Sequence, residues 1–326
     1  VSDRSPHFGN GQDGRFVRLD LAQRQHIIAN RHTPMSISFP SLLVMAAAVI
    51  YAVGALVVKR AADMKVGAWR TAFVANVITA LFFQPLFALG GKFHGELWWQ
   101  PAIVALCFVA GQWLTYVSLE RGDVSVATPV LGIKVLLVAM FVTATGGESL
   151  PLKLWLAAAL ATAGIALLNR SSGGERRHVS LTIVTAGLAA AAFAVFDVLV
   201  QRWSPAWGLG RFLPLTIGFA AVLSLAFIPR FSAPLTEVPR AAWPWLLGGA
   251  GAIAAQSVVF VSTIARWGHA PQANVIYSSR GLWSVLLVWT CGKWMLGSEA
   301  TLGGRVLAWR LAGAALMMSA IVLVLV

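Results

Sequence analysis

The chain has 326 residues, of which 58% are hydrophobic and 11% are charged, and its formal net charge is +13. A typical soluble protein carries about 25% charged residues, so this composition excludes an ordinary soluble domain. A helix crosses the hydrocarbon core with about 20 predominantly apolar residues, and irregular backbone is not tolerated facing lipid. Because the alternation typical of strands is missing, we expect an all-α integral membrane protein.

Residues 1–34 are polar, contain several arginines and have no sustained apolar face. They lack the apolar core of a signal peptide. Met35 stands directly before the first apolar stretch. We therefore interpret residues 1–35 as disordered or as a non-native N-terminal extension, and whether they belong to the native protein stays open.

Ten apolar spans follow, with boundaries that are uncertain by about 2 to 4 residues. The first five are expected at 39–58, 69–89, 101–120, 124–144 and 152–169, and the second five at 180–200, 211–228, 243–265, 270–291 and 305–326. This divides the chain into a first five-helix repeat (36–169), a polar linker (170–178) and a second five-helix repeat (179–326). The connections are too short for a soluble catalytic domain, so we do not expect an enzyme.

The two halves resemble each other at an offset of about 144 residues. In the first helices, Tyr51-Ala52-Val53 aligns with Phe193-Ala194-Val195. In the third helices, AGQWLTYVSLE aligns with AAQSVVFVSTI and places Gln112 over Gln256. In the fourth helices, Lys134 aligns with Arg280, each near the middle of its span. Because each half has an odd number of spans, the second half enters the membrane from the opposite side, as in the inverted repeats of secondary transporters.

The ten spans, the duplication, and the segments GDVSVATP (residues 122–129) and Gly147-Glu148 resemble the EamA-like family of the drug/metabolite transporter superfamily. The resemblance extends over residues 36–326, although residues 269–274 depart from the expected small-residue and proline pattern. It implies a transporter of amino acids, sugars, nucleotide sugars, phosphorylated metabolites or drugs, and the fold does not choose among them. The related triose-phosphate translocators are similar in using basic residues of the fourth and ninth helices to bind phosphate.

Lys134 and Arg280 are the principal candidates for substrate binding. A charge at the bilayer centre costs about 2.5 to 3.5 kcal/mol on insertion scales, so it normally faces the bundle interior or a water-filled cavity. Two converging cations favour a carboxylate or phosphate, which an arginine can bind through two parallel hydrogen bonds. The alternative is structural, with the cations paired to Asp197 or to backbone carbonyls.

Asp197 is the carboxylate placed well inside an expected span, in the sixth helix. A desolvated carboxylate can take up and release a proton near neutral pH, which makes Asp197 the candidate for proton coupling. A plain ion pair with a neighbouring cation is an equally good interpretation.

Five further residues, on the third, eighth and ninth expected helices, are candidates for substrate contact, namely Gln112, Gln256, Tyr116, Asn274 and Tyr277. The alternative for the glutamines is that they join helices, since such polar contacts contribute about 0.6 kcal/mol on average inside membranes. Aromatic residues in membrane proteins commonly pack or mark the interface instead.

Other chemistries find little support in the sequence. Cys107 and Cys291 lack a CxxC spacing and the histidines lie mostly in the tail and loops, so neither a metal nor a disulfide framework is indicated. There is no glycine-rich nucleotide loop and no cofactor is expected. The excess positive charge is spread over loops and tail, which indicates contact with lipid headgroups rather than with nucleic acid.

The sequence therefore predicts a secondary active transporter that moves a small anionic or zwitterionic metabolite (an amino acid, an organic acid or a phosphorylated compound) by alternating access. We expect it in the cell membrane, with the bacterial inner membrane as the favoured location. Two alternatives stay open: a membrane enzyme that modifies lipids, and a channel or structural subunit that does not transport. Membrane orientation and a homodimeric state also stay open.

Overall fold

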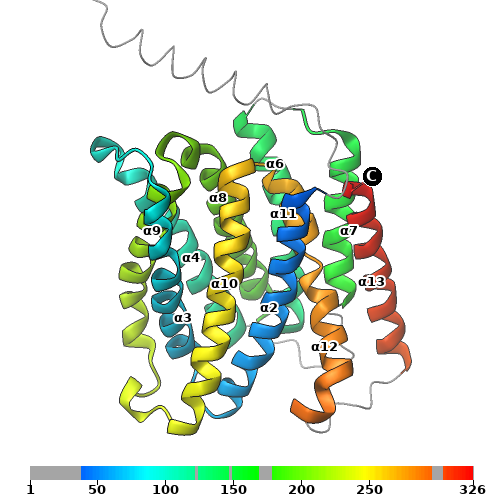
Figure 1. Cartoon of the computed structure of the whole chain (residues 1–326). Coiled ribbons are helices and arrows are strands. Elements are labelled where there is room, and N and C mark those ends of the chain that lie inside the picture. The colour runs from blue at the N-terminus through cyan, green and yellow to red at the C-terminus, as the bar shows by residue number, and fades with distance from the viewer. Residues whose placement is uncertain (1–37, 122–123, 147–148, 169–177, 296–303, 326) are drawn as a thin grey trace, which may run out of the picture.

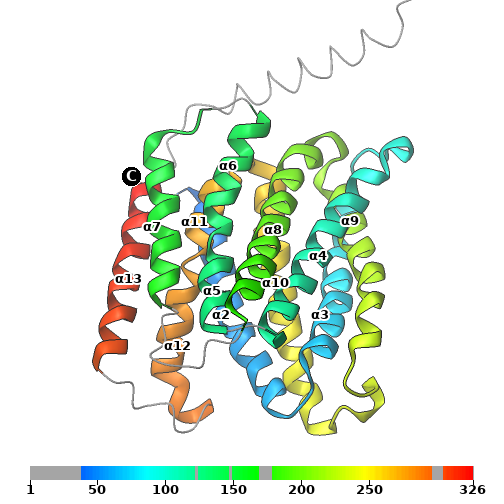
Figure 2. The same cartoon turned by 180° about the vertical axis from the view of Figure 1, so that it is seen from behind.

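The computed structural model describes residues 38–121, 124–146, 149–168, 178–295 and 304–325. Within these residues every regular element is a helix, and the helices form one bundle (Figures 1 and 2). The predicted N-terminal extension and most of the predicted linker lie outside the described residues. Gly147-Glu148, one of the segments that carry the family resemblance, lies outside them as well.

The helices in chain order are α2 (Phe39–Asp63), α3 (Ala68–Phe83), α4 (Trp99–Arg121), α5 (Val124–Gly132), α6 (Lys134–Gly146), α7 (Leu152–Leu168), α8 (Val179–Trp207), α9 (Leu209–Leu223), α10 (Trp243–Trp267), α11 (Ala270–Tyr277), α12 (Arg280–Met295) and α13 (Gly304–Leu325). Short 3-10 segments lie in the connections: η1 (Gln84–Leu89), η2 (Gly95–Leu97), η3 (Ser224–Arg230), η4 (Leu235–Glu237) and η5 (Arg240–Ala242). Three α-helices, α2, α10 and α11, begin with a proline in the first two positions, where its missing N–H has no helical partner to lose.

Helices occupy all ten predicted ranges, but eight of them are long and apolar enough in the described residues to cross a membrane. α7 is apolar but has only 17 residues, and the range 270–291 is divided between α11 and α12. The chain is thus an all-helical, multi-pass membrane protein. The count of ten spans stays a prediction.

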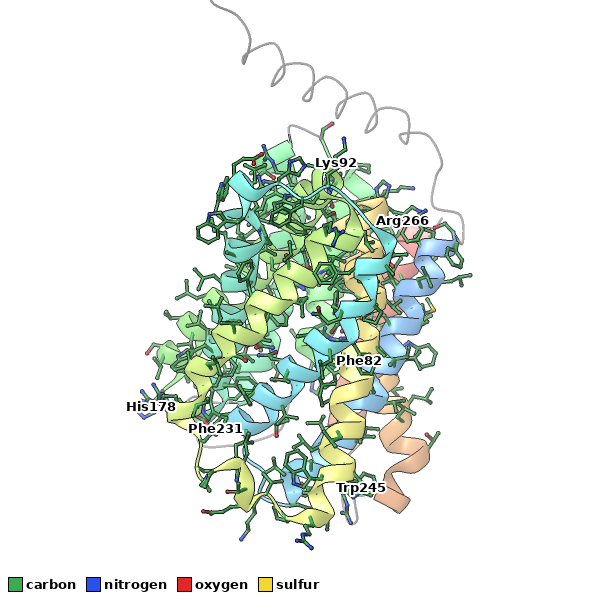
Figure 3. All side chains as sticks on the ribbon, turned by 60° about the vertical axis from the view of Figure 1, so that its left-hand side comes forward. Phe82, Lys92, His178, Phe231, Trp245 and Arg266 are labelled. Carbon is green, nitrogen blue, oxygen red and sulfur yellow. The ribbon has the colours of Figure 1, made fainter. Side chains whose placement is uncertain are left out.

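The outer surface suits a lipid environment. Large apolar side chains such as Leu81 and Val322 point outward with more than half of their surface exposed, at 63% and 52%. In Figure 3, Phe82 lies on the flank of the bundle, between Lys92 and Arg266 at one end and Trp245 at the other. An apolar band bounded by basic and aromatic residues is the distribution expected across a bilayer.

The helices pack in pairs that are distant in sequence. α2 lies against α10, α4 against α8, and α7 against α13. α7 and α13 form one flank of the bundle, while α3 and α9 lie toward the opposite flank (Figures 1 and 2). The residues between these flanks, on α2, α6, α8, α10 and α11, form the interior.

Glycines allow two of these pairs to approach closely. A Cβ atom at Gly249 of α10 would lie 2.6 Å from Cγ2 of Val58 on α2. A Cβ at Gly164 of α7 would lie 2.5 Å from Cγ of Met317 and 2.9 Å from the carbonyl oxygen of Gly313, both on α13. Small residues at such contacts let helix backbones touch inside a membrane, where dispersion replaces the hydrophobic effect as the packing force.

The fourth and ninth predicted spans are interrupted, which the sequence did not predict. Ile133 separates α5 from α6, and Ser278-Ser279 separates α11 from α12. In the first break, the N–H of Ile133 donates a hydrogen bond to the carbonyl of Val130, three residues earlier in the chain (3.1 Å). In the second, the hydroxyl of Ser278 donates to the carbonyl of Val275 (2.6 Å), a local bond that competes with the helical pattern. Non-helical backbone at membrane depth persists only where protein or a water-filled cavity surrounds it.

Candidate functional site

Each break in a helix is followed directly by a cation. Lys134 is the first residue of α6 and Arg280 is the first residue of α12. The first turn of a helix carries unsatisfied N–H groups and the positive end of the helix dipole. Each break therefore combines a formal positive charge with a positive backbone end, which is an arrangement that favours an anion.

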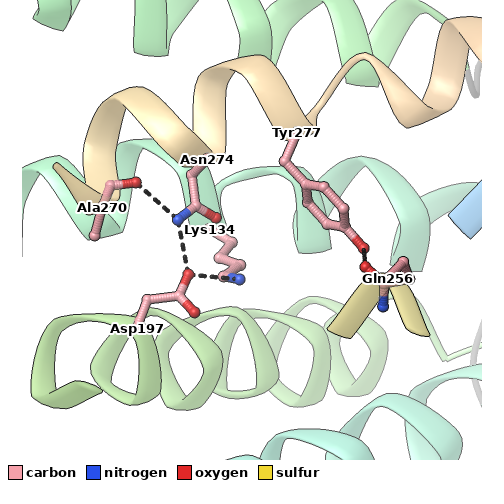
Figure 4. Close-up of polar contacts among 6 residues, drawn as sticks. All are labelled: Lys134, Asp197, Gln256, Ala270, Asn274 and Tyr277. Atoms are coloured by element: carbon pink, nitrogen blue, oxygen red, sulfur yellow. Dashed lines mark hydrogen bonds and ion pairs between the residues drawn. The ribbon is translucent and has the colours of Figure 1, made fainter. Parts of the chain in front are cut away.

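The charge of Lys134 is compensated inside the bundle. Its Nζ lies 2.8 Å from Oδ2 of Asp197 on α8, and the Asp197 side chain is 1% exposed. The same oxygen accepts a hydrogen bond from Nδ2 of Asn274 on α11 (2.7 Å), and that amide group also donates to the carbonyl of Ala270 (2.9 Å) (Figure 4). Three helices thus meet at one carboxylate oxygen. Of the two interpretations of Asp197, the structure forms the ion pair, and a role in proton coupling stays a prediction.

Arg280 lies in a different environment. Its guanidinium carbon is 4.9 Å from the ring centroid of Tyr51 on α2 and 4.7 Å from that of Tyr277 on α11. The side chain is half-buried, and within the described part of the chain no carboxylate lies in ion-pair distance of it. Cation–π contacts stabilise a guanidinium without cancelling its charge. Arg280 therefore retains a positive charge that a ligand can neutralise.

Aromatic rings connect the two cations. Nζ of Lys134 lies 5.8 Å from the ring centroid of Phe260 on α10, and Phe260 stacks on Tyr277 with a centroid distance of 4.2 Å. Tyr277 in turn borders Arg280. The two cations are thus parts of one cluster, as their alignment in the repeats suggests. That they face each other across a substrate cavity stays a prediction.

Gln256 belongs to the same cluster. The hydroxyl of Tyr277 donates to its Oε1 (2.8 Å), and its Nε2 donates to Oγ of Ser257 (2.7 Å) (Figure 4). Of the predicted site residues, the structure brings Lys134, Asp197, Asn274, Tyr277, Gln256 and Arg280 together.

Gln112 and Tyr116 have different partners. The amides of Gln112 and Asn76 form two reciprocal hydrogen bonds, of 2.8 and 2.9 Å, which join α4 to α3. Tyr116 packs its ring against Trp69 at a centroid distance of 5.3 Å. For Gln112 these bonds favour the helix-joining interpretation over substrate contact.

The sequence predicted Tyr277 as a site residue but missed Tyr51 and Phe193, the other aromatic partners of the cations, although the repeat contained the signal. Tyr51 lies beside Arg280, and Phe193, which aligns with Tyr51, lies beside Lys134 (5.9 Å from Nζ to the ring centroid). An aromatic residue at the same position of both first helices was therefore available as a site prediction. Ser279 and Trp283 were also missed, because neither position stands out in the repeat alignment.

The cluster contains groups that can bind a ligand. It offers cations, ring faces and amide groups, and within the described residues no group of three or more His, Cys, Asp or Glu side chains could hold a metal ion. Ring faces and a guanidinium can recognise an anionic molecule and release it unchanged.

Comparisons with known proteins agree with this description. Residues 38–170 match the model of the EamA-like transporter family. A search of curated proteins finds no match. Among solved structures, 29 chains match, including one described only as "Crystal structure of protein". That structure is 17% identical, covers 87% of this chain and 95% of its own, and superposes with a TM-score of 0.66. At this identity the likeness shows the fold alone.

The family match covers nearly all of the first predicted repeat, and the solved structure shares the fold of most of the chain. Eight candidate spans in the described residues are long and apolar enough to cross a membrane. The resemblance expected from the sequence is confirmed over residues 38–170, which match the EamA-like transporter family, and the chain is a multi-pass membrane protein.

Proposed function

We propose that the protein is a secondary active transporter of a small metabolite, and that an anionic group of this metabolite binds to Arg280. The observation that carries the proposal is the position of Arg280: it starts α12 at a break within the bundle and has no carboxylate partner in the described residues. A cation kept at membrane depth in this way is a functional-site hypothesis by default. A broken helix whose N-terminus points at an anion is a recurrent device in transporters.

We further propose the ten-helix, two-repeat arrangement, with α7 as the fifth span and α11–α12 as the ninth. The helix pairing supports it, since the first helix of each half packs against the third helix of the other: α2 on α10 and α8 on α4. The cations follow the same rule. Arg280 of the second half borders Tyr51 of the first, and Lys134 of the first borders Phe193 of the second.

The ends of the second helices supply an independent sign of this symmetry. Arg70, near the start of α3, donates to the carbonyl of Pro234 in the loop that follows η3 (3.3 Å). Arg211, near the start of α9, lies over the ring of Phe87 in η1 (5.5 Å to the centroid). Each arginine thus holds the segment that follows the second helix of the opposite half. Two such contacts at opposite ends suit two halves that rock against each other.

The remaining residues receive roles that follow from their contacts. Lys134, Asp197 and Asn274 are proposed to hold the two broken helices against α8, and release of Asp197 from Lys134 is proposed to accompany substrate movement or proton coupling. Gln256 and Tyr277 are proposed to orient the substrate beside Arg280. Gln112 and Tyr116 stay candidates for contact with the substrate only in another conformation of the transporter.

The test is an exchange assay with purified protein in proteoliposomes. Vesicles loaded with unlabelled amino acids, organic acids or sugar phosphates are supplied with the labelled compound outside, and counterflow is followed over time. The proposal predicts saturable counterflow of at least one anionic compound and its loss in Arg280→Ala. Flux that rises linearly with concentration would instead identify a channel, and a chemically altered lipid would identify an enzyme.

A further inference from the structure

The charges around the two helix breaks determine how much negative charge the site can take. Lys134 and Arg280 each contribute one positive charge, and Asp197 contributes one negative charge at 2.8 Å from Lys134. In the described residues of this cluster one positive charge is therefore left, and it lies on Arg280. A ligand with one negative charge makes the occupied cluster neutral.

A net charge on the occupied site would be costly inside the membrane. An uncompensated charge near the bilayer centre costs about 2.5 to 3.5 kcal/mol even on the mildest scales. A phosphate monoester carries about −1.5 to −2 charges at neutral pH, so it would leave the occupied site negative. A zwitterion would place an ammonium group near Arg280, and the carboxylate that could receive it already holds Lys134 and Asn274. Both mismatches favour a monoanion without an ammonium group.

Two neutral donors that lie close to Arg280 in the sequence have no hydrogen-bond partner among the described residues. Oγ of Ser279, which directly precedes Arg280, is buried without a hydrogen bond, and Ser279 is 3% exposed. Nε1 of Trp283, on the first turn of α12, is likewise buried and unpartnered. Ser279 and Trp283 are four residues apart and so lie on one face of the helix start. Buried donors left unpaired destabilise a protein, and oxygen atoms of a ligand could accept hydrogen bonds from them. Because both donors are neutral, they do not change the net charge of the site.

The surroundings of Arg280 also select the shape of the ligand. Its guanidinium lies against the rings of Tyr51 and Tyr277, and Tyr277 stacks on Phe260. A planar guanidinium matches the two oxygens of a carboxylate in one plane. Ring faces suit an apolar or aromatic body next to that carboxylate.

We propose that the site takes a monocarboxylate with an apolar or aromatic body, bound through Arg280 with Ser279 and Trp283 as additional donors. This inference rests on the proposed function, and it narrows the substrate to organic acids that carry one negative charge. Phosphorylated compounds and amino acids are the excluded alternatives.

Four probes with one ring and different head groups test the inference: benzoate, phenyl phosphate, phenylalanine and benzamide. Their affinities for the full-length protein are measured by titration calorimetry in detergent at pH 7.5. Benzoate should bind at least about tenfold more tightly than the others, because each of them mismatches the charge of the site. Tighter binding of phenyl phosphate or phenylalanine overturns the inference. So does equal binding of benzamide, which lacks the charge.

Variants locate the binding on the named residues. Arg280→Gln should abolish benzoate binding, and Trp283→Phe, which keeps the ring but removes the N–H, should weaken it by about tenfold, as expected for a hydrogen bond to a charged group. Arg266→Gln is the matched control, because Arg266 lies at the exposed end of α10. Should Arg280→Gln fail to fold, Trp283→Phe decides alone, and unchanged affinity in it contradicts the role of Trp283.

The exchange assay separates the two levels of the proposal. Counterflow of a phosphorylated compound or an amino acid, with no response to benzoate, refutes the monocarboxylate inference and leaves transport intact. Absence of counterflow for every class of compound refutes the proposed function itself.

Discussion

Removing either partner of the Lys134–Asp197 pair should destabilise the protein strongly, and removing both should not. At 2.8 Å the two charges attract with about 6 kcal/mol at an effective dielectric constant of about 20, and the cost of desolvating them offsets much of this. Loss of one partner leaves the other charge buried and unpaired, which costs about 3 to 5 kcal/mol.

The structure predicts an asymmetry between the two single variants. Asp197 is 1% exposed, whereas Lys134 is 18% exposed and can reach water more readily. Lys134→Met should therefore be more damaging than Asp197→Asn, which keeps the shape of the side chain.

The free energy of unfolding of the four proteins is measured by SDS titration in mixed micelles, which gives a double-mutant cycle. We expect a coupling energy that exceeds either single effect, at least about 5 kcal/mol, so that the double variant is more stable than either single variant. Glu96→Gln is the control, because Glu96 pairs with His94 at 3.8 Å and its side chain is 76% exposed, so we expect no measurable change. Additive effects of the two substitutions would refute the account of this pair.

Two further predictions concern helix packing. Gly164→Ala should lower stability by about 1 to 3 kcal/mol, because its Cβ would lie 2.5 Å from Met317 and 2.9 Å from the backbone of Gly313. Gly218→Ala should leave stability unchanged, because a Cβ at Gly218 would have no atom within 4 Å. Equal melting temperatures of the two variants would contradict the close contact of α7 and α13. Gln112→Leu should lower stability by about 0.6 to 1.7 kcal/mol by leaving Asn76 without its partner, while benzoate affinity is unchanged. Recovery of stability in Asn76→Leu/Gln112→Leu would support the pairing, whereas a loss of affinity in Gln112→Leu would return this residue to the binding site.

The sequence predicted the helical ranges well because length and hydropathy dominate in lipid. The starts of α2, α7 and α11 fall within one residue of the expected positions 39, 152 and 270. It missed the breaks in the fourth and ninth spans. These breaks depend on local hydrogen bonds, such as that of Ser278 to Val275, and hydropathy does not register them.

For the site, internal repetition was the informative signal. It located Lys134 and Arg280 at equivalent positions, and both begin a half-helix at a break. It did not show that Lys134 is paired with a carboxylate whereas Arg280 is not. That difference depends on the packing of α8, which places Asp197 next to Lys134. It also paired Gln112 with Gln256, although three-dimensional packing gives one an amide partner and the other a tyrosine.

Concentration-dependent counterflow in proteoliposomes, compared between the wild type, Arg280→Gln and Arg266→Gln, tests the central claim most directly. We predict saturable exchange of an organic anion in the wild type and in Arg266→Gln, and none in Arg280→Gln. Full exchange by Arg280→Gln, or flux that never saturates in the wild type, would contradict a transporter that binds its substrate at Arg280.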